Sequence, residues 1–248
     1  MPERKEGHHD HADVDMALAC LSRPTTAEDR FQVLQELVRY WHGPIGPQDG
    51  IRQEELDGVR LPLPLRRWYG WAGNREEILS GQNFLFSPKG DLHGFRKLRV
   101  EHDHLLFYIE NQGVYQWATL PEGDDPPVFG RYDDREVWQP EGIALSEHLI
   151  IACLFEAILC HSPHGASTAW LKEDKLQQIV GHTPHLSTLR WRWPGATRFY
   201  VGRGAFMCVC AHQIHGEAGY SIWIGAKTDE PLQFLKPHLD KDWEYVAV

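Results

Sequence analysis

The 248-residue chain has no long hydrophobic run, few cysteines and no excess of basic residues. Its longest apolar stretch, LIIACLF (149–155), is much shorter than the roughly 20 residues that a membrane-spanning helix needs. The first residues, MPERKEGHHDHADVD, are polar and contain no apolar core of a secretory signal. The five cysteines are odd in number and irregularly spaced, which argues against a disulfide framework. We therefore expect a folded protein of the reducing cytoplasm, with no membrane partner.

The chain also lacks the positive charge that nucleic-acid-binding proteins usually carry. Its formal net charge is −10, so no direct nucleic-acid partner is expected. The acids are concentrated, because residues 101–141 hold ten of them and two arginines, whereas residues 60–100 hold eight basic residues and three acids. Such an acidic segment is either a solvated or neutralised face of the fold, or a surface that attracts a basic partner.

Signatures of catalysis are missing as well. GRGAF (202–206) lacks the Walker pattern and its Lys-Ser/Thr pair, so no phosphate loop is expected. In CVCAHQIH, Cys208, Cys210 and His212 alternate and would share one face of a strand, with His215 three residues further on. The gap between the cysteines is tighter than the usual zinc spacing, and small side chains facing a core explain the same pattern. We predict no catalytic residue, no metal and no cofactor, and keep a metal-dependent hydrolase built on Cys208, Cys210 and His212 as an alternative.

Hydrophobic spacing and turn residues predict the elements of the first two thirds of the chain. Thr25 and Glu28 have the spacing of a capping box. ALSEHLIIACLFEAILC (144–160) is apolar nearly all round, which predicts a buried helix. Pro126 and Pro127 predict a loop between strands rich in β-branched and aromatic residues. The expected elements are a helix at 25–41 with the apolar stripe Phe31, Leu34, Leu37, Val38 and Trp41, a short helix at 64–70, strands at 84–88, 104–110, 114–119 and 135–140, a loop at 120–134, and the buried helix at 144–160.

The last third of the chain predicts more hairpins. Because strands follow one another without regular crossover helices, an α+β class fits better than a doubly wound parallel sheet. We predict a mostly antiparallel sheet flanked by helices, with an additional C-terminal α+β extension. The predicted parts are a flexible N-terminal tail (1–22), an α+β domain (23–160) and an extension packed on the same domain (161–248). Within the extension we expect a loop at 161–168, a helix at 170–180, strands at 197–202, 205–212 and 220–226, and a short helix at 229–239.

The stretch RWRWPG alternates two tryptophans with two arginines. On a strand, Trp191 and Trp193 would lie on one face, and Arg190 and Arg192 on the other. Aromatic and cationic faces of this kind can stack nucleic-acid bases, but a strand that covers a hydrophobic core needs the same pattern. Because the whole chain is acidic, we favour a strand that covers a core over a surface that stacks nucleic-acid bases.

The segment LLFYIENQGVYQWATLPEGDDPPV (105–128) resembles the middle of immunity proteins of the SUKH superfamily. A strand ends in an acid-Asn-Gln-Gly bend, a return strand carries a tryptophan, and a loop with Asp-Pro-Pro-Val follows. LPLPLRRWYGWAG (61–73) is similar to the leucine-proline and aromatic-glycine helix of that family, and the likeness covers roughly residues 24–160. The residues that carry it are Glu110, Asn111, Gln112, Gly113, Trp117, Asp125, Pro126, Pro127 and Val128, with Leu63, Pro64, Leu65, Tyr69 and Gly73 in the helix.

The resemblance implies a mostly antiparallel α+β fold and a function in binding. It implies the role of many superfamily members, which is to neutralise polymorphic toxins, often nucleases or deaminases, by binding them. We therefore expect an antitoxin that binds a basic toxin domain stoichiometrically, with a regulatory protein-interaction scaffold as a further alternative. The acids expected to contact the partner are Asp124, Asp125, Asp133, Asp134 and Glu136.

The motif residues are expected to shape the bend and the loop. Gly113 should take a positive φ, and Trp117 should belong to the core. Buried side chains of Asn111 and Gln112 would satisfy main-chain groups of the loop. Pro126 and Pro127 would stiffen the loop and lower the entropy lost on docking.

Overall fold

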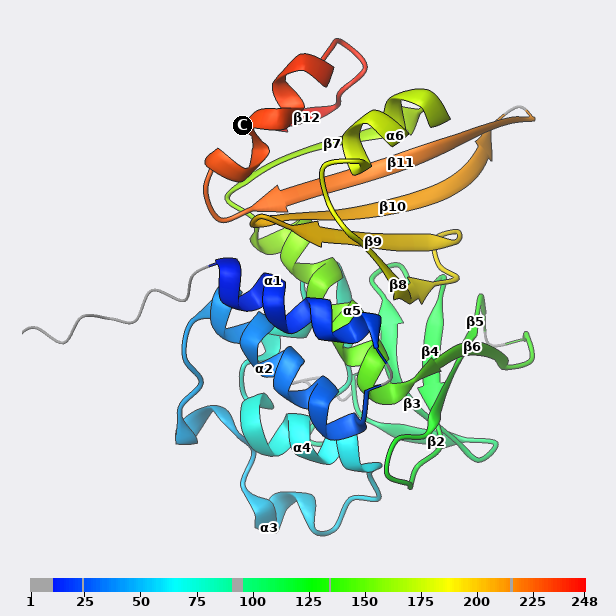
Figure 1. Ribbon diagram of the computed structural model, residues 1–248. Coiled ribbons are helices and arrows are strands. Elements are labelled where there is room, and N and C mark those ends of the chain that lie inside the picture. Colours follow the sequence, from blue (N-terminus) through cyan, green and yellow to red (C-terminus); the bar gives the residue numbers. More distant parts are fainter. Residues whose placement is uncertain (1–10, 24, 91–95, 134, 215) are drawn as a thin grey trace, which may run out of the picture.

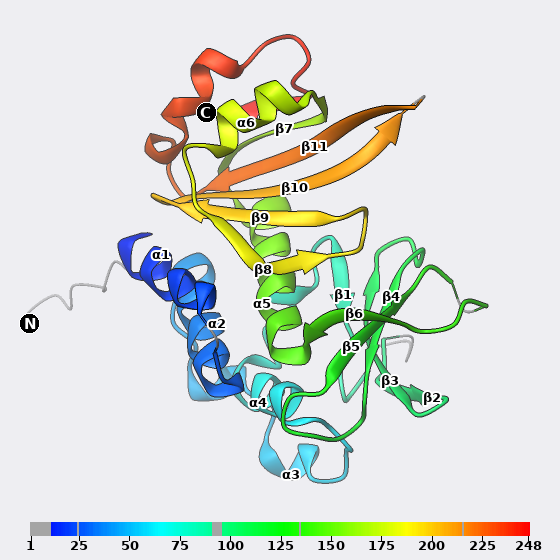
Figure 2. The same cartoon turned by 45° about the vertical axis from the view of Figure 1, so that its right-hand side comes forward.

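The computed structural model describes residues 11–23, 25–90, 96–133, 135–214 and 216–248. Two six-stranded sheets, each built from antiparallel strand pairs, form the framework. Helix α5 (Leu145–Glu156) lies between helix α2 (Ala27–His42) and the first sheet, with the second sheet across its end (Figures 1 and 2). The predicted α+β class, with antiparallel sheets flanked by helices, is confirmed.

The first sheet has the strand order β1-β3-β4-β5-β6, and β2 pairs with β3 outside this path. Neighbouring strands are joined by hairpins, so the sheet is a meander from β3 to β6. The predicted strand at 104–110 matches β3, a short aliphatic and aromatic run whose consecutive residues 105–108 are buried on both faces of the sheet. The strands are β1 (Asn83–Leu85), β2 (Arg99–Glu101), β3 (His104–Glu110), β4 (Gln116–Thr119), β5 (Pro127–Arg131) and β6 (Gln139–Ala144).

The second sheet has the strand order β12-β7-β11-β10-β9-β8, with β8 and β12 at its edges. The long hairpin of β10 and β11 forms its centre, and β9 matches the strand predicted at 197–202. The strands are β7 (His164–Leu171), β8 (His185–Trp191), β9 (Thr197–Gly202), β10 (Ala205–Ile214), β11 (Glu217–Ala226) and β12 (Tyr245–Ala247).

Two predicted loops contain strands. Pro127 is the first residue of β5, a position where a proline removes no hydrogen bond from the strand interior. The segment expected as a loop at 161–168 contributes most of β7, where a Cβ on Gly165 would overlap the carbonyl oxygen of Ile224. The glycine that made this segment resemble a loop is therefore required by the close approach of the neighbouring strand. The strand predicted at 135–140 begins later, at Gln139.

Helices cover the sheets on several sides. The predicted short helix at 64–70 corresponds to α4, and the final predicted helix is a 3₁₀ helix. The α-helices besides α2 and α5 are α1 (His11–Ala19), α3 (Gln53–Leu56), α4 (Leu63–Ala72) and α6 (Glu173–Val180). The short 3₁₀ and π segments are η1 (Cys20–Ser22), η2 (Pro47–Asp49), η3 (Glu76–Leu79), η4 (Ala157–His161) and η5 (Glu230–His238).

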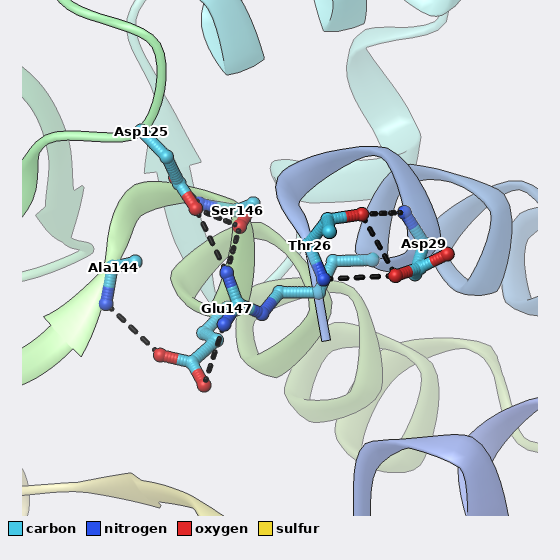
Figure 3. Close-up of polar contacts among 7 residues, drawn as sticks. Thr26, Asp29, Asp125, Ala144, Ser146 and Glu147 are labelled. Carbon is cyan, nitrogen blue, oxygen red and sulfur yellow. Dashed lines mark hydrogen bonds and ion pairs between the residues drawn. The ribbon is translucent and has the colours of Figure 1, made fainter. Parts of the chain in front are cut away.

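Helix α2 is capped one residue later than predicted. The Thr26 hydroxyl accepts from the main-chain N–H of Asp29 at 3.2 Å, and the Asp29 carboxylate accepts from the main-chain N–H of Thr26 at 2.8 Å (Figure 3). This reciprocal pair is a capping box with aspartate in place of the expected glutamate. The predicted apolar stripe is confirmed, since Leu34, Leu37, Val38 and Trp41 are buried and Phe31 packs against the same cluster.

The prediction of a flexible tail over residues 1–22 is wrong for residues 11–22. They form α1 and η1, which lie along α2 in Figure 1. Val14, Leu18 and Leu21 are buried, and their spacing places them on one helical face. The segment before Val14 is dominated by charged residues and histidines, which made the whole stretch resemble a polar tail. Residues 1–10 lie outside the described residues.

One hydrophobic cluster joins residues of the first sheet, α2, α4 and α5 to the inner face of the second sheet. Trp191, Phe199 and Phe206 of the second sheet belong to it, as do Phe107 and Trp117 of the first. A smaller cluster lies on the opposite face of the second sheet, under α6 and η5. The predicted domain 23–160 and the extension 161–248 thus share a core.

A buried carboxylate at the end of α5 anchors the first strand. Glu156 accepts hydrogen bonds from the main-chain N–H groups of Gly81 at 3.0 Å, Gln82 at 2.5 Å and Asn83 at 2.8 Å. The Tyr108 hydroxyl donates a fourth at 2.9 Å. Burial raises the pKa of Glu156 and the four donors oppose that rise. Glu156 is therefore an architectural residue.

Candidate functional site

The acids predicted as one contact surface lie at opposite ends of the first sheet. Asp124 and Asp125 are in the β4–β5 loop, whereas Asp133 and Glu136 are in the β5–β6 loop. The five residues of β5 separate the two loops, a length of about 17 Å at the usual rise of a strand. We call the β4–β5 loop, residues 120–126, the capping end of the sheet. We call the β3–β4 turn and the β5–β6 loop, residues 111–115 and 132–138, the turn end.

Asp125 serves the fold, so its prediction as a contact residue is wrong. Its carboxylate accepts from the main-chain N–H of Ser146 at 2.9 Å and from the Ser146 hydroxyl at 2.7 Å (Figure 3). Arg30 of α2 donates to the same carboxylate at 2.8 Å and lies 3.6 Å from Glu147. The side chains of Asp125 and Arg30 are only 16% and 15% exposed. Asp125 therefore satisfies the N-terminus of α5 and ties it to α2.

The rest of the capping end is also attached to the fold. The main-chain N–H of Leu63, in the first turn of α4, donates to the carbonyl of Gly123 at 2.9 Å. Glu122 forms an exposed ion pair with Arg60 at 2.8 Å. Asp124 is exposed but stands between these fixed points. Contacts with α4 and α5 hold the loop in place, in addition to the stiffness of Pro126 and Pro127.

At the turn end, Glu110 performs the role that was predicted for its neighbours. Its carboxylate accepts from the main-chain N–H groups of Gln112 at 2.9 Å and Val114 at 3.2 Å. Glu110 is 4% exposed, whereas Asn111 and Gln112 are exposed, so the prediction that these two are buried is wrong. Gly113 has a φ of 76°, as expected. An ionised carboxylate satisfies several amides at once, which a neutral amide side chain does less well.

Exposed apolar side chains gather around acids at the turn end. Val114 is 46%, Tyr132 49% and Val137 76% exposed. Asp133 accepts from the main-chain N–H of Arg135 at 2.6 Å, and Glu136 accepts from that of Tyr132 at 3.3 Å. Each carboxylate uses one oxygen for the loop and remains exposed. We call Val114, Tyr132, Asp133, Glu136 and Val137 the turn-end patch; Asp134 lies outside the described residues.

The patch rests on a buried polar pair that the sequence did not indicate. The Tyr115 hydroxyl donates to Glu141 at 2.6 Å, and the Tyr115 and Tyr132 rings meet edge to face with centroids 4.9 Å apart. Burial raises the pKa of Glu141, and it also raises the pKa of Tyr115. A Cβ on Gly130 would overlap both polar side chains, so only glycine leaves room for them. Trp117 is fully buried beside this pair, which confirms its predicted place in the core.

A cleft of about 560 Å³ opens beside the patch, where β6 of the first sheet approaches the β8–β9 hairpin of the second. The main-chain N–H of Arg192 donates to Glu141 at 3.3 Å across this junction. Trp191, the last residue of β8, is buried in the shared core, and Trp193, in the β8–β9 turn, packs against it. Both tryptophans of RWRWPG therefore contact the core as interpreted, but the strand ends at Trp191. The lining residues are Tyr132, Glu141, Arg190, Trp191, Arg192, Ala196, Thr197 and Arg198.

The candidate metal ligands on β10 are used separately. Cys208 is fully buried in the shared core, and the Cys210 thiol donates to a main-chain carbonyl 3.0 Å away. Nε2 of His212 lies 2.8 Å from the Ser221 hydroxyl. Burial raises the pKa of both thiols, which favours the thiol over the thiolate that zinc requires. Among the described residues no group of three or more His, Cys, Asp and Glu side chains could hold a metal ion, and His215 lies outside them.

Comparisons of the chain with protein-family models, with curated proteins and with solved structures gave no match. Across the residues that the structure describes, no helix has the length and apolar character needed to cross a membrane. The functional conclusion therefore rests on the geometry of the turn end and on the sequence motifs.

Proposed function

We propose that this chain is a non-catalytic binding protein that uses the turn-end patch to contact a protein partner. One observation carries the proposal: Val114, Tyr132 and Val137 are all exposed, in two loops at the same end of the sheet that also carry the acids Asp133 and Glu136. Apolar side chains rimmed by charged ones are typical of protein contact surfaces. The capping end is left out of the surface, because Asp125 is engaged with α5 and α2.

We further propose that the partner is a basic toxin domain of the nuclease or deaminase type, which the chain neutralises by stoichiometric binding. The resemblance of residues 105–128 to SUKH-superfamily immunity proteins supports this class of partner. The net charge of −10 supports a basic one, since opposite charge speeds encounter. A regulatory scaffold would use the same patch, and the identity of the partner separates the two functions.

The experiment is purification of the tagged chain from its native cell, identification of the co-purifying protein, and measurement of its affinity for matched variants. Asp133→Lys with Glu136→Lys should slow association and flatten its salt dependence, and Val137→Ser should speed dissociation. The control is Glu122→Lys with Asp124→Lys, which changes the charge equally at the capping end. Equal affinities for the turn-end and capping-end variants would overturn the assignment of the patch.

A further inference from the structure

Four parts of the chain meet around His42, the last residue of α2. His161 ends the π segment η4 that continues α5, and its ring meets the His42 ring edge to face, with centroids 4.7 Å apart. Nε2 of His161 lies 3.0 Å from the carbonyl oxygen of Glu77 in η3. Lys227, which directly follows β11, reaches the same end of α2. The histidine contact therefore lies where α2, α5, η3 and the second sheet come together.

Two permanent cations already satisfy the carbonyl end of α2. The Lys227 ammonium donates to the carbonyl of Tyr40 at 2.7 Å, and the Arg75 guanidinium donates to that of His42 at 3.4 Å. A histidine at the end of a helix usually gains stability from protonation, because its charge interacts with the free carbonyl groups. Here Lys227 and Arg75 take that role, so a charge on the His42 imidazole meets two like charges instead.

The surroundings of the His42 imidazole favour its neutral form. Its Nε2 is buried and has no hydrogen-bond partner in the described part of the chain. A charged ring donates from both nitrogens, so protonation would leave a buried N–H of a cation without an acceptor. Glu77 forms an ion pair with Arg75, and the same guanidinium lies 3.8 Å from the Asp49 carboxylate. The acids near the ring are therefore already engaged with Arg75.

The direction of the pKa shift agrees with this geometry. Burial is the largest cause that lowers the pKa of His42, to about 4. The positive charges of His161, Arg75 and Lys227 act in the same direction, and the negative charge of Glu77 acts against them. An exposed histidine takes up a proton near its ordinary pKa of about 6.5. Stability that depends on neutral His42 is therefore complete above pH 6.5 and is lost as the pH falls from there toward 4.

We propose that the His42–His161 contact is an acid-sensitive joint, which holds the last turn of α2 against the end of α5 while His42 is neutral and opens locally when His42 takes up a proton. The opening reaches the second sheet, because the two residues before His42 pack against it. The rings of Tyr40 and Trp41 have centroids 5.7 and 5.2 Å from that of Phe206 in β10. Acid thus loosens the attachment of the second sheet to α2, whatever partner the turn-end patch binds.

Hydrogen exchange followed by mass spectrometry tests the proposal on the full-length chain at pH 7 and pH 5, after correction for the intrinsic exchange rate at each pH. The opening constant of residues 38–45 should rise about twentyfold at pH 5, the ratio that follows from a pKa of about 6.5 in the open form and about 4 in the closed form. His42→Phe keeps an aromatic ring but does not titrate, so it should remove this response. His42→Gln should remove it as well, which keeps the test valid if the phenylalanine variant folds poorly.

Two further variants separate the joint from other histidines. His182→Phe makes the same substitution at an exposed histidine of the α6–β8 loop and should keep the full response. His148→Phe should also keep it, because a local opening at the end of α2 leaves the fully buried His148 of α5 in place. An equal response of residues 38–45 in the natural chain and in both His42 variants would overturn the proposal. A response that His148→Phe reduces would also overturn it, because these residues would then open only with the whole fold.

Discussion

The two ends of the first sheet contain similar acidic loops that do different work. At the capping end, Asp125 contacts the N-terminus of α5 and the guanidinium of Arg30, and it is largely buried. At the turn end, the hydrogen bonds that Asp133 and Glu136 accept within the described part of the chain come from nearby main-chain N–H groups, and both acids remain exposed in the loop that carries Tyr132 and Val137. The difference lies in what faces each loop: a helix terminus and a cation at one end, solvent at the other.

This comparison shows why charge along a sequence is a poor guide to a contact surface. A carboxylate next to unsatisfied helix amides is stabilised by them and becomes part of the fold. A carboxylate with no such partner stays hydrated, and its charge can attract an approaching molecule of opposite charge. The distinction depends on the place of α5, whose residues are about 20 positions away along the chain from Asp125.

Among substitutions in the two acidic loops, we expect Asp125→Ala to destabilise the fold most. The substitution leaves the partly buried Arg30 without its nearest partner and removes the cap of α5, so we expect the free energy of unfolding to fall by about 3 kcal/mol. Urea denaturation followed by circular dichroism measures it. The neighbouring control, Asp124→Ala, should cost less than about 0.5 kcal/mol. Equal losses for the two variants would show that Asp125 has no structural role.

Acid should weaken the helix that the capping end holds. His148, in the first turns of α5, is fully buried among four aromatic rings whose centroids lie 5.0 to 5.6 Å away, and burial lowers its pKa to about 3. The unfolded chain takes up this proton below its ordinary pKa of about 6.5, so stability is lost as pH falls from there toward 3. From pH 7 to pH 5 the expected loss from this residue is about 2 kcal/mol.

Urea titrations at both pH values, on the natural chain and on His148→Phe, check this expectation. His148→Gln is the control for packing, because it keeps a polar side chain but does not titrate. Both variants should lose about half of the pH dependence over this interval, because His42 contributes a loss of similar size. Part of the slope should remain, because burial also lowers the pKa of His42 to about 4. A slope unchanged in both variants would contradict the assignment to His148.

Glu110→Ala should destabilise the fold less than Asp125→Ala, because the buried Glu110 carboxylate holds only the β3–β4 turn. Its two hydrogen bonds to main-chain N–H groups are lost, and we expect a decrease of about 1.5 kcal/mol in the free energy of unfolding. Asn111→Ala, one residue further on and exposed, should change stability by less than about 0.5 kcal/mol. Thermal or urea denaturation distinguishes them. A larger effect for Asn111 would restore the original expectation that the amide side chains support the bend.

Local patterns predicted several elements closely and others poorly. The strands at 104–110 and 197–202 match β3 and β9, because a short run of aliphatic and aromatic residues bounded by turn residues is a local signal. Helix α1 was missed, since only its packing against α2 and the second sheet explains the burial of Val14 and Leu18, with Leu21 of η1 beside them. Strands β5 and β7 were missed because proline and glycine at their starts resemble loop residues.

Local residue patterns are enough to predict the α+β class, the bend at Gly113, the core position of Trp117 and the apolar character of α5. Each of these follows from side-chain size, spacing or backbone freedom within a few residues. Three outcomes emerge only from the folded chain: which acids are structural, that Glu110 rather than its amide neighbours holds the turn, and that Glu141 lies between Tyr115 and the main chain of Arg192. Those outcomes depend on groups far apart along the chain, and a carboxylate has a role only once its partner in space is fixed.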